Sequence, residues 1–143
     1  MKSLFKFFAV LTLALAFAAP HAAAQSTKNR LVLKAPFSFT IEDHEVPAGT
    51  YWITLQDGWL QMQTADGQAV MSVLTLPTEG KSSEGKARAI FHRYHSRYFL
   101  SQVWLASSER GRQTLESHEE RRSRKLEAPQ AIVVQLSGKD AGR

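Results

Sequence analysis

The chain has 143 residues and no cysteine, and its 18 Lys and Arg against 13 Asp and Glu give a formal charge of +5. Without cysteine there is no disulfide framework, no thiol nucleophile and no c-type haem attachment. A length of this order predicts one domain.

Residues 1–24 have the features of a signal peptide. Lys2 and Lys6 precede the apolar run FFAVLTLALAFAA, and three alanines follow it at 22–24. The run is shorter than the ~20 residues of a transmembrane helix, and the small residues suit a signal peptidase, which predicts cleavage before Gln25. An uncleaved N-terminal membrane anchor is the alternative. We therefore expect an exported protein, periplasmic or extracellular, that would touch the membrane only through an uncleaved signal peptide.

The remaining chain predicts a single β domain over residues 25–143, with its core within 30–136. The stretch 36–56, PFSFTIEDHEVPAGTYWITLQ, predicts two strands that pair as a hairpin around the polar turn 42–45, because apolar and polar residues alternate on both sides. In the PAGTY turn that follows, we expect Gly49 to supply a backbone conformation that other residues resist. The acids at 42–45 are oxygen ligands for a hard cation such as Ca²⁺, but without a calcium-loop motif a solvated turn is the favoured interpretation.

Further strands are predicted on either side of this stretch. Residues 30–34 have the apolar content of a short strand, and two Asp-Gly dipeptides, at 57–58 and 66–67, predict tight antiparallel turns. Between and after these turns lie predicted strands at 59–64 and 69–76, the second of which is apolar on both faces.

The polar stretch 77–85 is expected to be a surface loop. Beyond it, 87–94 and 97–106 predict an aromatic-rich hairpin that turns at His95-Ser96. Strict alternation along the second strand of this hairpin would place on one face Tyr98, Leu100, Gln102 and Trp104.

The last part of the chain predicts a short helix and a final strand. Ser117 with Glu120 three residues later forms a capping box, and residues 117–127 favour helix although they offer almost no apolar face. Pro129 ends the helix, and AIVVQL at 131–136 has strong β propensity. Together these elements predict an all-β fold, an antiparallel meander forming a sandwich or partly open barrel with one short C-terminal helix.

Several motifs occur together after the predicted signal peptide: PFSFT at 36–40, VPAGTY at 46–51 and FHRYHSRYFLSQVW at 91–104. Their combination resembles a group of small exported proteins of unknown function that is abundant in acidobacterial-type genomes. The resemblance spans residues 33–125 and implies a secreted β domain, but it brings no activity, cofactor or site residue. The sequence departs from that pattern at His95-Ser96, where a Gly-Asp turn is expected, and AIVVQL looks like a local extension.

Charge is unevenly divided along the chain. Residues 42–79 contain six acidic residues and no Lys or Arg, whereas residues 80–112 have a net charge of +5. The favoured interpretation is that strands from these two halves pair their charges within one domain. The basic run RRSRK at 121–125 is neutralised by neighbouring glutamates, and this argues, with the predicted export, against nucleic acid as a partner.

The sequence contains no catalytic motif of a recognised kind: no G-x-S-x-G, no HExxH and no glycine-rich phosphate loop. Ser101 has only His92 as a conceivable base, and the histidines lack the spacing of a zinc site. We therefore expect no catalytic residue, no metal and no cofactor.

Three tryptophans are the remaining indication of binding. Trp52, Trp59 and Trp104 are predicted ligand contacts because Trp52 and Trp59 share strand faces with polar residues, although simple coverage of a second layer is the competing interpretation. The expected function is a non-catalytic exported domain that binds a small ligand or an envelope protein. A structural or assembly protein acting through exposed strand edges is the alternative, and an uncharacterised hydrolase ranks third.

Overall fold

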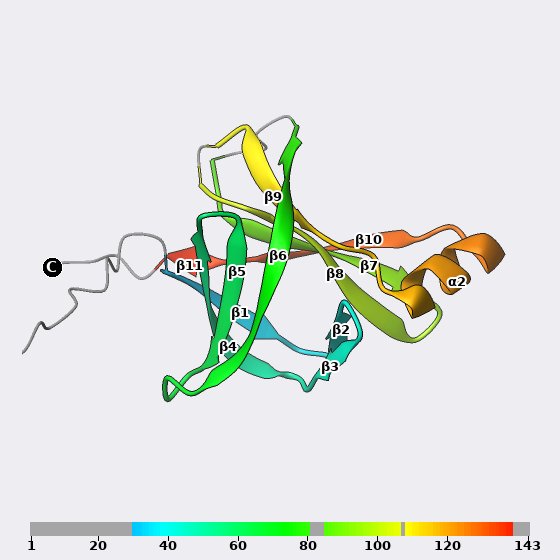
Figure 1. Cartoon of the computed structure of the whole chain (residues 1–143), viewed down its shortest axis with the longest axis horizontal. Helices are drawn as coiled ribbons and strands as arrows, with labels where there is room; N and C mark the ends of the chain where they lie inside the picture. The colour runs from blue at the N-terminus through cyan, green and yellow to red at the C-terminus, as the bar shows by residue number, and fades with distance from the viewer. Residues whose placement is uncertain (1–29, 81–84, 107, 139–143) are drawn as a thin grey trace, which may run out of the picture.

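The computed structural model describes residues 30–80, 85–106 and 108–138, and the predicted signal peptide lies outside these described residues. They form strands and one helix, which confirms the predicted all-β class with a short C-terminal helix (Figure 1). The elements are β1 (Arg30–Ala35), β2 (Phe39–Ile41), β3 (His44–Val46), β4 (Gly49–Gln56), β5 (Trp59–Thr64), β6 (Ala69–Glu79), β7 (Arg88–Tyr94), β8 (Arg97–Trp104), β9 (Arg110–Thr114), α2 (His118–Leu126), β10 (Gln130–Gln135) and β11 (Ser137–Gly138).

The described strands form one sheet that curves around a single core. Hydrogen-bonded neighbours follow the order β10-β7-β8-β9-β6-β5-β4-β1-β11, with the small β2–β3 ribbon attached beside β8. Two meanders, β4-β5-β6 and β7-β8-β9, meet in β6, whose first half pairs with β5 and whose second half pairs with β9. The long strand β6 therefore connects the two meanders, which form the two layers of a sandwich or partly open barrel (Figure 1).

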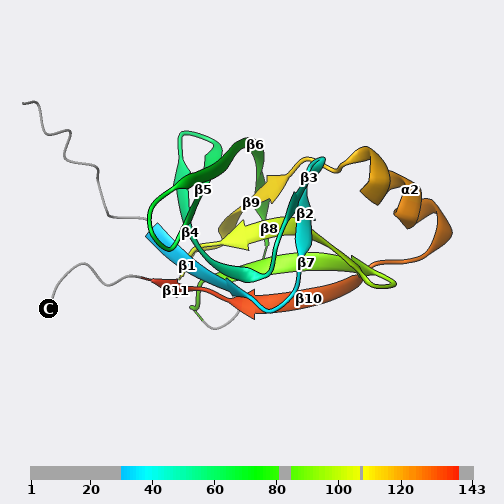
Figure 2. The same ribbon diagram turned by 90° about the horizontal axis from the view of Figure 1, so that it is seen from below.

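The C-terminal segment lies at both ends of this strand order. β10 pairs with β7, β11 pairs with β1, and Leu136 between them donates its backbone N–H to the carbonyl oxygen of Ala87. Figure 2 shows β1, β10 and β11 along the same side of the molecule. The two pairings bring the ends of the sheet close together while leaving the barrel open.

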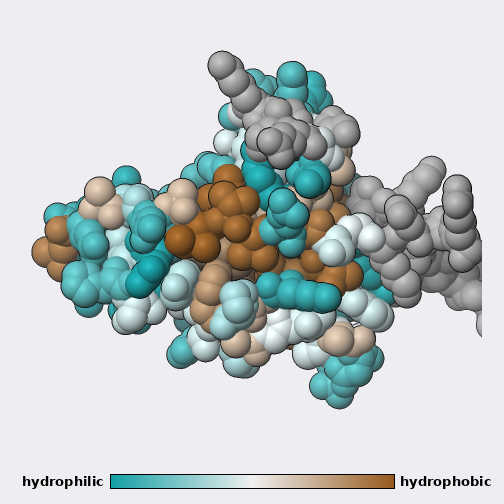
Figure 3. All heavy atoms as spheres, turned by 180° about the vertical axis from the view of Figure 1, so that it is seen from behind, coloured by the Kyte–Doolittle hydropathy of each residue, from teal (hydrophilic) through white to brown (hydrophobic). Residues whose placement is uncertain are grey.

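Alternate residues of the strands fill the core. Leu33, Ile53, Leu60, Met62 and Phe91 are completely buried, as the period of two predicts for the inward positions. On the rear face apolar side chains also gather near the surface over β10 (Figure 3), where Val133 is 56% exposed and its two neighbours pack partly against the core.

The predicted pairing of the two strands within 36–56 is wrong. β2 instead pairs with β3 through a two-residue turn, while β4 pairs with β1 on one side and β5 on the other. β3 could not be recognised in the sequence, because the strand has only three residues, two of them polar and exposed, and Pro47 follows directly after it. Gly49 does not adopt the left-handed conformation either, and a Cβ there would meet the Tyr51 hydroxyl at 3.5 Å, an ordinary contact. What fixes this turn is a hydrogen bond of 2.7 Å from Tyr51 Oη to the carbonyl oxygen of Pro47.

The second hairpin turns at His95-Ser96, as predicted, but the predicted faces of its return strand are wrong. The register shifts between Ile90 and Phe91 of β7. Ile90 pairs with Gln102 of β8 and Phe91 with Leu100, so Ser101 between them is an extra residue without a partner in β7. Such a bulge reverses the direction of the side chains beyond it. The inner face of the return strand consists of Tyr98, Leu100 and Val103, and the outer face of Phe99, Gln102 and Trp104.

The stretch 77–85 is not wholly a loop. β6 continues through Pro77 to Glu79, where it pairs with β9, a strand that the sequence pattern does not reveal. The sequence of β9, RGRQT, has no run of β-branched or aromatic residues, so its pairing depends on tertiary contacts and not on local propensity.

Candidate functional site

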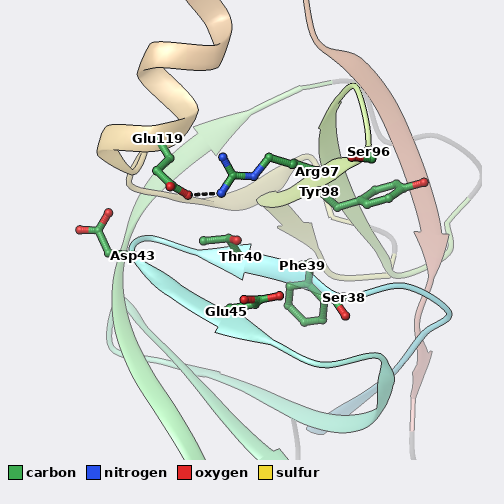
Figure 4. Close-up of a pocket in the computed structure, with 9 residues that line it drawn as sticks. All are labelled: Ser38, Phe39, Thr40, Asp43, Glu45, Ser96, Arg97, Tyr98 and Glu119. Carbon is green, nitrogen blue, oxygen red and sulfur yellow. Dashed lines mark hydrogen bonds and ion pairs between the residues drawn. The ribbon is translucent and has the colours of Figure 1, made fainter.

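A groove opens where three segments of the chain meet: the β2–β3 hairpin, the turn between β7 and β8, and the first turn of α2 (Figure 4). Its cavity volume of about 500 Å³ is within the range of ligand sites in proteins. The lining residues are Ser38, Phe39, Thr40, Asp43, Glu45, Ser96, Arg97, Tyr98 and Glu119.

Two tight turns position the charged side chains of this groove. Glu42 and His95, the first residues of the β2–β3 and β7–β8 turns, have positive φ angles of 52° and 54°, a conformation that two-residue hairpin turns favour because it matches the twist of the strands. The first turn puts Asp43 at the tip of its hairpin and Glu45 on β3. The second brings Arg97 to the start of β8, on the other side of the groove (Figure 4).

The groove is acidic. Arg97 Nη2 lies 2.5 Å from Glu119 Oε2, so the only basic residue of the lining already has a carboxylate partner. Asp43 and Glu45 are exposed, and in the described part of the chain their carboxylates have neither a hydrogen bond nor an ion pair. The three acids against one arginine leave the lining with a formal charge of −2.

A strand edge borders the groove. β2 and β8 share a single parallel bridge, Thr40 with Phe99, whereas β2 and β3 share three pairs. In a two-residue hairpin the closing pair is hydrogen-bonded and the next pair, here Thr40 with Glu45, is not, so the backbone N–H of Glu45 faces away from β2. Among the described strands β3 has no second neighbour. Its outer edge is therefore open to an added strand.

The helix α2 forms the remaining wall, and it is fixed to the second hairpin by one ion pair and two histidine–carboxylate contacts. Ser117 Oγ accepts the backbone N–H of Glu120 at 2.9 Å, which confirms the N-cap half of the predicted capping box, while the Glu120 carboxylate contacts His92. Glu120 lies on the buried side of α2. A buried carboxylate needs a partner, and His92 supplies it. The basic side of the second hairpin thus pairs with the helix, through Arg97–Glu119 at 2.5 Å, His92–Glu120 at 3.0 Å and His95–Glu127 at 2.6 Å.

Tyr94 lies under the same helix. Its hydroxyl is buried and has no hydrogen-bond partner among the described residues. Burial raises the pKa of Tyr94, and the nearby carboxylates of Glu120 and Glu116 raise it further, against an opposing effect of Arg124. The phenol is therefore neutral at physiological pH, and its ring packs at 5.8 Å from that of Phe99.

The three tryptophans predicted as ligand contacts lie apart from this groove. Trp52 is half-buried, and the guanidinium of Arg30 lies over its ring at 4.4 Å from the centroid. Trp59 is 45% exposed on the outer face of β5. Trp104 is 4% exposed and lies against Gly111. None of the three lines the groove of Figure 4, and their predicted role in binding stays a prediction.

The side chains considered for catalysis and metal binding have other contacts. His92 pairs in register with Phe99 and its Nδ1 contacts Glu120, while Ser101 is 6% exposed in the bulge of β8. A second pair, His95 with Glu127, lies in a shallow hollow whose other lining residues, Arg93 and Gln130, supply no nucleophile. Within 30–80, 85–106 and 108–138, no three His, Asp or Glu side chains are grouped to hold a metal ion.

Comparison with known proteins gives no relative: no protein-family model, no curated protein and no solved structure matches this sequence. In the described part of the chain, no helix combines the length and the apolar character that crossing a bilayer requires.

Proposed function

We propose that this protein is an exported, non-catalytic binding domain of the cell envelope whose acidic groove receives an extended cationic segment of a partner protein. The proposal depends above all on Asp43 and Glu45, two carboxylates without a partner among the described residues, beside an open strand edge. Charged groups without an internal partner favour a partner of opposite charge and speed its association. The signal-peptide features of residues 1–24 support export.

An extended protein segment suits this groove better than a compact small molecule does. The edge of β3 offers the outward backbone N–H and C=O of Glu45, and an added strand binds through such groups. The opposite side is already rigid, because the Tyr98 ring stacks on Phe37 at 3.8 Å and Arg97 is paired with Glu119. A lysine or arginine of the partner would meet Asp43 or Glu45 while its backbone follows β3.

Removing both carboxylate charges, Asp43→Asn with Glu45→Gln, is expected to weaken binding of a lysine-rich extended peptide about two- to thirtyfold. The expectation follows because exposed ion pairs contribute ~0.2–1 kcal/mol each, and 1.4 kcal/mol corresponds to a factor of ten. Fluorescence anisotropy with a labelled peptide of alternating Lys and Thr, at low and at physiological salt, measures the affinities. The difference between parent and variant should shrink as salt is added.

The matched control is Glu79→Gln, which removes an exposed charge from the same acidic half of the chain outside the groove. It should bind the peptide as the parent does. A loss of binding free energy in the control as large, per charge removed, as in the double variant would mean that the peptide senses only net charge, and would reject the groove. A pull-down from native envelope with the parent and the double variant then tests whether the variant that binds the peptide weakly also fails to capture one envelope protein that the parent captures.

A structural or assembly role through strand edges is the second candidate, favoured by the open edge of β3. Glu45→Pro removes an outward N–H while leaving the bonded pairs of the β2–β3 hairpin in place, and proline blocks strand addition at an edge. If the chain assembles through β3, this variant should remain monomeric in sedimentation experiments at concentrations where the parent forms oligomers. Assembly that survives the proline would exclude the β3 edge.

A further inference from the structure

A second cleft lies on a different part of the molecule, where the end of β4, the second half of β6, the end of β8 and β9 come together. Its cavity volume of about 340 Å³ is smaller than that of the acidic groove. The lining residues are Leu55, Pro77, Val103, Leu105, Ser108, Arg110, Gly111 and Arg112. The aliphatic residues and the two arginines make this cleft different in chemistry from the groove beside α2.

The inner part of the cleft is apolar. Val103 is completely buried, and Leu55 and Leu105 are partly buried against the hydrophobic core. Pro77 completes this surface and pairs in register with Arg112 across the β6–β9 ladder. The core therefore reaches the surface here through aliphatic side chains, and an alkyl chain placed on them would be removed from water.

The mouth of the cleft carries two arginines. Alternation along β9 places Arg110 and Arg112 on one face, while Gly111 between them faces the Trp104 ring on the other. In the described part of the chain neither guanidinium has a hydrogen bond or an ion pair, although Glu79 lies opposite Arg110 in the ladder. Arg112 Nη2 reaches the β4–β5 turn, where it lies 3.6 Å from the position of a Cβ on Gly58.

We infer that this cleft binds a medium-chain alkyl carboxylate, a fatty acid whose chain lies on Leu55, Pro77 and Leu105 above the buried Val103 and whose carboxylate is bound by Arg112 with help from Arg110. A guanidinium presents a planar fork of donors that matches a carboxylate, and a neighbouring apolar wall strengthens that interaction by excluding water. At roughly 30 Å³ for each water-sized group, the cavity holds about ten heavy atoms. This site is independent of the acidic groove and of the function proposed for it.

Isothermal titration of the purified protein with decanoate, below its micelle concentration, tests the inference. We expect saturable binding at one site, and no comparable binding of decyltrimethylammonium, which has the same chain and the opposite charge. Arg112→Gln should weaken decanoate binding about ten- to hundredfold, because a hydrogen bond between charged groups contributes ~1.5–3 kcal/mol.

Two further variants separate the site from folding and from net charge. Arg110→Gln changes an exposed residue at the mouth and should also weaken binding, so the test remains decisive if Arg112→Gln proves unstable. Arg122→Gln on the exposed face of α2 removes the same charge away from the cleft and should bind decanoate as the parent does. Absence of decanoate binding, equal binding of the cationic amphiphile, or full binding by a folded Arg110 or Arg112 variant would each overturn the inference.

Discussion

Phe91→Ala is expected to lower the free energy of unfolding by about 3–5 kcal/mol, the usual cost of removing a buried phenylalanine ring. Phe91 is completely buried, and its ring contacts those of Phe37 and Phe39 edge-on, each at 5.2 Å between centroids. Phe39 in turn meets Tyr51 edge-on at 6.2 Å. The ring thus connects β7 with the segment that carries β2, and its removal also loosens one wall of the acidic groove.

Urea unfolding followed by tryptophan fluorescence measures this change, and a constant slope of free energy against urea shows that the unfolded state is unaffected. Leu126→Ala is the control, since Leu126 is 86% exposed and its truncation should change stability by less than about 0.5 kcal/mol. A loss below 1 kcal/mol for Phe91→Ala would mean that the second hairpin does not pack on the segment around Phe37 as the structure shows. The loss of unfolding free energy in Phe91→Leu should lie between those of Phe91→Ala and Leu126→Ala.

Those parts of the fold that depend on local chemistry were predictable from the sequence. Asp57-Gly58 forms a two-residue turn in which both residues have positive φ, 50° and 85°, the conformation for which Asp-Gly is favoured. The N-cap at Ser117 is present for the same reason, because Ser117 and Glu120 are three residues apart. The turn at His95-Ser96 also follows from the two aromatic runs on either side of it.

The parts that depend on tertiary pairing were not predictable in the same way. The bulge at Ser101 has no local signal, yet it reverses which side of the sheet Trp104 faces. β9 forms because β6 and β8 both present unpaired edges to it, and RGRQT itself carries no β pattern. A strand of three residues such as β3 is likewise set by the hairpin and core around it, with Val46 as its single buried residue.

The candidate site was predictable only in its residue types. The excess of acid at 42–45 was visible in the sequence and was interpreted as a solvated turn, whereas Arg97 and Glu119 gave no signal because their partners lie 22 residues apart in the chain. The same argument applies to the second cleft, whose aliphatic wall comes from three separate strands or strand ends. The three tryptophans line neither hollow, so the residue type that pointed to binding in the sequence did not indicate where these two hollows lie.

Gly111→Ala is expected to destabilise the protein by about 3 kcal/mol, the upper end of the range for overpacking. A Cβ on Gly111 would lie 2.7, 2.8 and 2.9 Å from three ring atoms of Trp104, well inside contact distance. The ring cannot move aside at little cost, because Trp104 is 4% exposed, donates Nε1–H to Gln102 at 3.0 Å and has Arg88 at 5.2 Å from its centroid. Thermal unfolding by circular dichroism should show the loss as a lowered midpoint.

Gly138→Ala is the matched control, since no heavy atom lies within 4 Å of the added Cβ, and it should melt as the parent does. Trp104→Leu in the Gly111→Ala background should recover part of the stability, because the smaller side chain makes room for the methyl group. A Gly111→Ala protein that melts with the parent would show that Trp104 does not press on β9. Arg110 and Arg112 would keep their direction in that case, because the pairing of β9 with β6 and β8 places both on the face opposite Gly111.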